Sequence, residues 1–374
     1  MKSGRWLLAV AAVPVAALVL GELAGDWVFG VREVRPDPAR EPADATRAAA
    51  HAAFAHDTAP ADPAAAGVAF FLQSLTTAVR DGKAAAAAER FDPDRFHATV
   101  ARADAFREAG LTPDPVGGPV RAQMALADAV RAGGAGLAAD SVEVRRVVPG
   151  ADPAEVIAYT RQRLGGRAGS YRWWLVRTPD GWKAFDLEDV RVGVRLSRQA
   201  AAQVARSDGA VAPEVKAGLA ALGPAADRLA AGDPDGAAAA LGPARTAALP
   251  RDGYAARCLI EGGVAAMKGR ATEAREWADR AAAAAPGLPA TDYLRAAAAA
   301  AARDWEGVVG PARAYLDTVG PDAPTARLLG TALRELGHPA EAVAAFESGL
   351  RDDPARDDLR AARDHARGLI PTPK

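Results

Sequence analysis

The 374-residue chain is poor in the residues that most often build a catalytic or metal centre. It has a single cysteine, Cys258, which excludes an intramolecular disulfide. Cys258 falls within an expected helix and is interpreted as a small core residue rather than a thiol nucleophile. The sequence has no Walker loop, dinucleotide-binding glycine fingerprint, Gly-x-Ser-x-Gly elbow, His-Glu-x-x-His or paired-cysteine motif. We therefore expect no catalytic centre, no cofactor and no metal.

An excess of charge of one sign is also lacking. Lys and Arg total 46 against 47 Asp and Glu, for a formal net charge of −1. Aromatic residues make up only 6% of the chain, and no stripe alternates basic and aromatic side chains. A protein that binds nucleic acid usually presents a basic face, so this class is not expected. The length favours two or three domains.

The N-terminus does contain an apolar run. Lys2 and Arg5 precede an uncharged hydrophobic stretch at 6–20. Two interpretations stay open for residues 1–30. One is a cleaved secretory signal ending near Gly21, and the other is an uncleaved transmembrane anchor over about 6–23 with Trp27 at the interface. Both place the bulk of the chain outside the cytoplasm, either anchored to a membrane or secreted or periplasmic.

Residues 31–66 are expected to form a flexible linker. They have mixed charges and no apolar periodicity, and they carry five prolines: Pro36, Pro38, Pro42, Pro60 and Pro63. Segments of this composition do not bury enough apolar surface to fold alone.

Residues 67–205 are predicted to form an α+β domain, because the apolar period changes from helical to alternating within them. Helices are expected around 67–80, 93–110 and 120–132. Strands are expected at 141–148, 155–160, 171–177 and 182–187, and 190–196 either extends the sheet or leads out of it. Asp180-Gly181 is typical of a hairpin turn between the third and fourth strands. Helices followed by an antiparallel meander indicate an α+β fold.

The segment from Trp173-Trp174 through Gly181-Trp182 to Asp186-Leu187 resembles the nuclear-transport-factor-like fold. It is also similar to the last strands of periplasmic phospholipid-carrier proteins. The first resemblance implies a cone of helices on a curved sheet, with a pocket that some members use for catalysis and others only for binding. Trp173 and Trp174 should point to opposite faces of their strand.

Few titratable residues of this domain are candidates for chemistry. Asp186, Glu188 and Asp189 form a carboxylate cluster that would suit acid–base work or a cation. No histidine stands near them in the sequence, so we interpret them as a solvated strand end. His97 has no partner near it in the sequence and is interpreted as a surface or capping residue.

The last third of the chain repeats about every 34 residues. Three series of positions carry this spacing: two consist of small or apolar residues, and the third falls at prolines or a glycine that are expected to end helices. The series are Gly262, Ala296 and Gly330; Ala274, Val308 and Ala342; and Pro286, Gly320 and Pro354. With Leu329, Phe346 and Gly349, these positions resemble the tetratricopeptide repeat family. Leu333 and Ala326 depart from the family pattern, which prefers an aromatic and a large residue there.

The resemblance implies an all-α solenoid of helical hairpins over 210–370. Hairpins are expected at about 218–251, 255–288, 289–322 and 323–356, and 357–369 is predicted to be a capping helix. Gly232-Asp233-Pro234 and Arg303-Asp304-Trp305 are expected turns between paired helices. Each hairpin would bury its apolar face only against its neighbours.

Such a solenoid indicates a binding function. We expect a membrane-tethered, extracytoplasmic scaffold or adaptor, without enzymatic activity, that holds a protein or peptide in the groove of the first helices. Arg295, Arg327 and Arg334 are the candidate groove residues, because arginine suits carboxylate-bearing peptides. The alternative is a small-ligand carrier or enzyme that uses a pocket in the α+β domain. A pocket filled by Trp and Phe favours the scaffold, whereas an open cavity with convergent polar groups favours the alternative.

Overall fold

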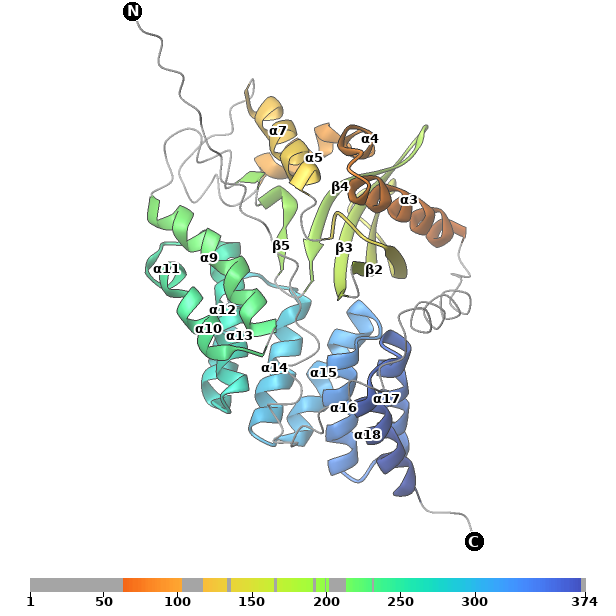
Figure 1. The fold of residues 1–374 in the computed structure, drawn as a ribbon, viewed down its shortest axis with the longest axis vertical. Helices are drawn as coiled ribbons and strands as arrows, with labels where there is room; N and C mark the ends of the chain where they lie inside the picture. Colours follow the sequence, from red (N-terminus) through yellow and green to blue (C-terminus); the bar gives the residue numbers. More distant parts are fainter. Residues whose placement is uncertain are drawn as a thin grey trace, which may run out of the picture.

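The computed structural model of the chain describes residues 63–102, 117–132, 136–164, 167–190, 193–198, 200–201, 213–230 and 232–370. They form an α+β region followed by a helical part. Figure 1 shows the helices of the α+β region at the top, its sheet in the middle and the helical part as a row below. The predicted membrane segment 1–30 lies outside the described residues. Among the helices that are described, none is both long and apolar enough to cross a membrane.

The sheet of the α+β region is an antiparallel meander. Its described strands are β1 (Ser141–Pro149), β2 (Glu155–Leu164), β3 (Arg167–Thr178), β4 (Gly181–Asp189) and the short β5 (Val194–Arg195). Each strand pairs with the next one in the chain, giving the order β1-β2-β3-β4-β5. The four predicted strands are therefore confirmed. β5 contains two residues of the predicted 190–196 extension.

Four described helices precede the sheet in the chain: α3 (Pro63–Arg80), α4 (Ala84–Ala88), α5 (Pro93–Ala101) and α7 (Gly117–Ala132). α3 begins before the predicted domain boundary at 67. α5 begins where Asp92 accepts a 2.9 Å hydrogen bond from the backbone NH of Arg95, with Pro93 as the first helical residue. The part of the predicted helix 93–110 beyond residue 102 lies outside the described residues.

The core of this region lies between the helices and one face of the sheet, here called the inner face. Trp173, Phe91, Phe96 and Leu75 are all buried there. Trp174 points the other way and clusters with Val176 and Phe185. The prediction that the two tryptophans face opposite sides is confirmed. We call the side that carries Trp174 the outer face.

The helical part consists of paired antiparallel helices. Its described elements are α9 (Pro213–Ala230), α10 (Pro234–Ala240), α11 (Gly242–Thr246), α12 (Arg251–Met267), α13 (Ala271–Ala284), α14 (Pro289–Ala301), α15 (Trp305–Val319), α16 (Ala323–Glu335), α17 (Pro339–Asp352) and α18 (Asp357–Gly368). α12, α14 and α16 each pack against the helix that follows, and also against one another in sequence. The two predicted turns are confirmed, because helices end and begin on either side of them, and α18 packs on α16 and α17 where the capping helix was expected.

Burial in this row recurs every 34 residues. On α13, α15 and α17, two series of positions at this spacing have no exposed surface at all: Ala274, Val308 and Ala342, and Ala278, Ala312 and Phe346. Most of these residues are small, so the helices approach one another closely. Gly330 is an example, because a Cβ atom there would lie 2.5 Å from the ring of Phe346.

The turns between paired helices also recur every 34 residues. Gly269, Arg303 and Gly337 each follow the first helix of a pair, and each has a positive φ, of 70°, 57° and 81°. A left-handed residue ends a helix and frees the chain to reverse direction. Glycine takes this conformation without steric cost, whereas Arg303 takes it with a side chain.

Candidate functional site

The α+β region and the helical row meet along the loops that join one hairpin to the next. Near β5, Gly193 lies against Leu288, just before α14. After β4, Val190 is buried with Tyr315 and Val319 of α15. Farther along, β1 and β2 contact α16 and α17 through the charged residues described next. Along the sheet from β5 to β2, the contacts thus move along the row from α14 to α17, as Figure 1 also shows.

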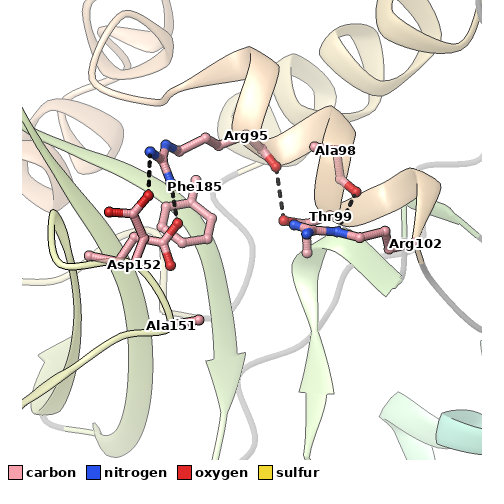
Figure 2. A pocket seen from close by; sticks show the side chains of 8 residues that line it. Arg95, Ala98, Thr99, Arg102, Ala151, Asp152 and Phe185 are labelled. Carbon is pink, nitrogen blue, oxygen red and sulfur yellow. Dashed lines mark hydrogen bonds and ion pairs between the residues drawn. The ribbon is translucent and has the colours of Figure 1, made fainter.

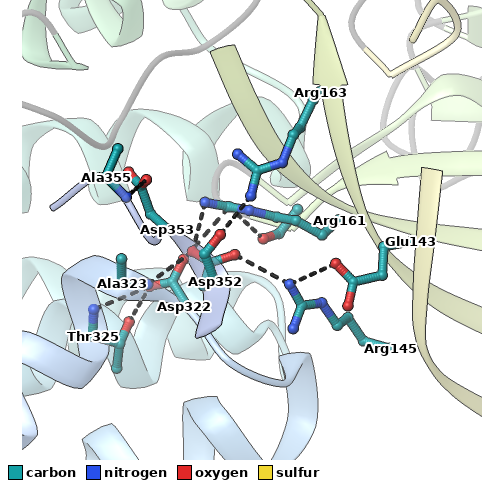
Figure 3. A network of polar contacts seen from close by, with 11 residues as sticks. Glu143, Arg145, Arg161, Arg163, Asp322, Ala323, Thr325, Asp352, Asp353 and Ala355 are labelled. Atoms are coloured by element: carbon teal, nitrogen blue, oxygen red, sulfur yellow. Dashed lines mark hydrogen bonds and ion pairs between the residues drawn. The ribbon is translucent and has the colours of Figure 1, made fainter. Parts of the chain in front are cut away.

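Asp352, at the end of α17, is the centre of the last of these contacts. Its carboxylate has no exposed surface and accepts a 2.8 Å hydrogen bond from Arg161 of β2 and a 3.3 Å one from Arg145 of β1. It also accepts a 2.9 Å hydrogen bond from the backbone NH of Ala323, at the start of α16. Arg163 donates to the backbone carbonyl of Asp352. Figure 3 shows these side chains converging from the sheet and from the helices.

Two further carboxylates complete the network. Asp322 lies 3.7 Å from Arg161 and caps α16 through the backbone NH and hydroxyl of Thr325. Glu143 lies 2.9 Å from Arg145. Burial raises the pKa of Glu143 and lowers the pKa of Arg145, since removal from water disfavours both charges. Three arginines therefore face three carboxylates, which suits a structural junction between the two parts.

The carboxylate cluster of β4 is buried, so its interpretation as a solvated strand end is wrong. Asp186, Glu188 and Asp189 are 1%, 2% and 7% exposed. Asp186 accepts hydrogen bonds from the hydroxyl of Ser197 at 2.7 Å and from its backbone NH at 3.0 Å. The short helix that begins after β5 thus covers this carboxylate. Burial raises the pKa of Asp186.

Glu188 is held by arginines on the outer face. Arg172 donates to both of its oxygens at 2.8 Å, and Arg195 donates to one at 3.3 Å. The same two guanidinium groups lie over the ring of Trp174, at 4.8 and 3.9 Å from its centroid. Ion pairs combined with cation–π contacts fix all of these side chains. Asp186 and Glu188 are thus both held in place by hydrogen bonds and ion pairs of the fold.

The remaining titratable candidates lie in other elements. His97 is half-buried on α5. Cys258 is buried in α12 with Leu259, Ala278 and Leu294, as its interpretation as a core residue predicts. Burial raises the pKa of its thiol, which disfavours the nucleophilic thiolate.

The three predicted groove arginines have different surroundings. Arg327 is buried, with a side chain only 9% exposed, and lies 3.7 Å from Asp358 of α18. Arg295 is 38% exposed and donates a 3.0 Å hydrogen bond to Asp279 of α13. Arg334 is 25% exposed and pairs with the adjacent Glu335 at 2.6 Å. Arg295 and Arg334 are therefore the members of the set that reach solvent.

A cavity of about 360 Å³ lies beside α5 and is open to solvent on one side. Figure 2 shows its walls. They come from α5, from the β1–β2 connection with the start of β2, and from β4, and comprise Arg95, Ala98, Thr99, Arg102, Ala151, Asp152, Glu155 and Phe185. Phe185 belongs to the Trp174 cluster, so this cavity is distinct from the space between the helices and the inner face. That space holds the fully buried Trp173, Phe91 and Phe96.

Neither a protein-family model nor a curated protein sequence matches the chain. Among solved structures, a phospholipid-binding protein from Ralstonia solanacearum, in complex with a phospholipid, matches 46% of this chain and 94% of its own. The sequence identity is 17% and the TM-score is 0.26. A similarity of this size indicates neither a shared fold nor a shared ligand.

Proposed function

We propose that this chain is a non-catalytic scaffold whose helical row is a tetratricopeptide-type solenoid that holds a protein or peptide. The observation that carries the proposal is the 34-residue recurrence of both burial and left-handed turns along α12–α17. Stacked hairpins of this period form extended surfaces for binding, and their energy comes from neighbour contacts. The buried ion pairs of Glu188 and Asp352 favour a structural role for these charges.

The partner would bind on the side of the first helices. The loops between hairpins are covered by the α+β region, because Leu288, Val319 and Asp352 all contact it. Arg295 and Arg334 are half-buried side chains on α14 and α16, and each holds a carboxylate of its own chain. A partner rich in carboxylates would replace Asp279 and Glu335 in these pairs.

Contacts with the α+β region would keep the helical row in one orientation relative to that region. The sequence at 1–30 supports a membrane tether or a secretory signal, and both imply an extracytoplasmic location. Fractionation of cells that express the chain with and without residues 1–30 tests this part. An anchored chain resists a carbonate wash, whereas a soluble product that begins near Glu22 indicates cleavage.

Partner binding is tested by selecting from a peptide display library with the full chain as bait. We expect the enriched peptides to carry Asp, Glu or a free terminal carboxylate, and we expect the double substitution Arg295→Ala/Arg334→Ala to abolish the enrichment. The matched control replaces three exposed arginines of the second helices by alanine: Arg275, Arg313 and Arg351.

Equal enrichment by the wild type and the double variant would remove Arg295 and Arg334 from the binding surface. Turnover of a substrate that is lost on changing Asp186 or His97 would overturn the non-catalytic role.

A further inference from the structure

The cavity beside α5 has charged groups of opposite sign on opposite sides. Figure 2 shows Asp152 on one side with Arg95 above it, and Arg102 across the cavity. Glu155, which pairs with Arg95, also lines the cavity. Its volume of about 360 Å³ is within the range of sites for small organic molecules. Phe185, Ala98 and Ala151 supply apolar surface between the charged groups.

The side with the carboxylates carries excess negative charge. Arg95 is the cation there, and it is shared by three acidic residues. It pairs with Glu155, lies 3.5 Å from Asp152, and lies 3.8 Å from Asp92 behind the wall. One positive charge against three negative charges leaves this side attractive to a cation. The Asp152 side chain is 48% exposed, so a ligand can reach it.

The opposite side carries a cation, Arg102, that pairs with no carboxylate among the described residues. Within the described residues, the guanidinium of Arg102 makes one hydrogen bond, from Nε to the backbone carbonyl of Ala98 at 3.1 Å. This bond orients the group and leaves its two terminal nitrogens for another acceptor. A guanidinium presents such nitrogens well to a carboxylate, which accepts two parallel hydrogen bonds.

We infer that this cavity is a binding site for a small zwitterion that carries an ammonium and a carboxylate group. The ammonium would lie beside Asp152 and Glu155, the carboxylate would lie on Arg102, and the short carbon chain between them would lie on Phe185. A molecule with only one of the two charges satisfies one side and leaves the other unmatched. This inference is independent of the scaffold role of the helical row.

The test is saturation-transfer difference NMR on the full-length chain with γ-aminobutyrate, β-alanine and glycine as probes. These differ only in the separation of their two charges, and at least one of them should bind. Butyrate and butylamine keep the carbon chain and one charge each. We expect their affinity to be lower by roughly tenfold or more, since a hydrogen bond to a charged group contributes about 1.5–3 kcal/mol.

Two substitutions locate the site. Arg102→Ala should weaken the best zwitterion by roughly tenfold or more, as butylamine does, because it removes the carboxylate partner. Asp152→Asn should weaken it as well, while its amide oxygen still accepts the 2.9 Å hydrogen bond that Asp152 takes from the NH of Ala154. Arg131→Ala, at an exposed arginine of α7, is the control and should bind like the wild type.

Three results would overturn the inference. The first is that none of the three zwitterions binds up to its solubility limit. The second is that butyrate or butylamine binds as tightly as the best zwitterion. The third is that Arg102→Ala binds like the wild type, which would place the ligand elsewhere.

Discussion

Arg161 and Asp352 lie 191 residues apart in the chain and are joined by a 2.8 Å hydrogen bond that crosses from the sheet to the last hairpin. The Asp352 side chain is fully buried, and the Arg161 side chain is 10% exposed. The free energy of this contact therefore depends on both parts of the molecule being folded and in place. The α+β region and the helical row should behave as one cooperative unit.

We predict that Asp352→Ala lowers the free energy of unfolding by about 3–5 kcal/mol, because it leaves buried arginines without their carboxylate. Urea unfolding followed by tryptophan fluorescence measures the change. Asp279→Ala is the matched control, since its carboxylate is 63% exposed, and should shift stability by less than about 1 kcal/mol. An unchanged midpoint for Asp352→Ala would contradict a net stabilising role for this buried contact.

We predict that Arg303→Gly stabilises the protein. Arg303 has a φ of 57°, a conformation that costs a residue with a side chain about 1–2 kcal/mol. Glycine avoids this cost, but it loses more conformational freedom on folding, which offsets about 0.5–1 kcal/mol of the gain. The net gain should be about 0.5–1 kcal/mol in a urea titration. Arg313→Gly, at an exposed position within α15, should have the opposite sign and cost about 1 kcal/mol. Destabilisation by both would mean that the Arg303 side chain itself stabilises the turn.

The turn at Arg303 also shows how much of the fold the sequence predicts. Local signals place the strands, the turns and the 34-residue period, because they depend on alternation, on Gly, Asp and Pro at turns, and on small residues at close contacts. The neighbours Asp304 and Trp305 and the 34-residue period predict a turn at Arg303, although arginine itself does not favour a left-handed conformation.

The buried charges could not be predicted in the same way. Asp186 and Glu188 alternate along β4 as solvated residues would, and they are buried because Ser197, Arg195 and Arg172 cover them. The partners of Asp352 lie on β1 and β2, and no local pattern pairs residues across such a separation. In the sequence, Arg161 and Arg163 lie two apart on one strand and therefore on the same face, which indicates a basic site there. This spacing does not indicate which carboxylate binds them.

We predict that Gly330→Ala destabilises the last hairpin by about 1–3 kcal/mol, because its Cβ would lie 2.5 Å from the ring of Phe346 and the hairpin is closely packed. Gly368→Ala is the control. Apart from the local helix backbone, no atom lies within 4 Å of a Cβ at Gly368, at the end of α18, so this change should stabilise the helix by up to about 1 kcal/mol. Urea unfolding of the two variants should therefore give shifts of opposite sign. Equal effects would contradict the close packing of α16 on α17.

The final prediction concerns the pH dependence of stability through Asp186. Burial raises the pKa of this carboxyl in the folded protein, so the folded state holds its proton more tightly than the unfolded chain does. Its contribution is fully present below the unfolded pKa of about 3.9 and is lost as the pH rises through the folded pKa. Asparagine has no proton to lose, and its amide oxygen still accepts from the NH groups of Ser197 and Leu187. The stability of Asp186→Asn relative to the wild type should therefore rise between about pH 4 and pH 7.

Urea titrations at a series of pH values measure this difference, and Asp186→Ala separates the effect of charge from the effect of the hydrogen bonds. Alanine leaves the buried hydroxyl and NH of Ser197 without their acceptor, so this variant should be about 1–3 kcal/mol less stable than the asparagine variant at every pH. At neutral pH the asparagine variant should lose much less free energy of unfolding than the alanine variant. The difference in stability between the two variants should then report the hydrogen bonds alone. If Asp186→Asn instead becomes less stable relative to the wild type as the pH rises, the ionised carboxylate is the form that the fold prefers. Arg195, which contributes to the electrostatic environment of Asp186, would then outweigh burial.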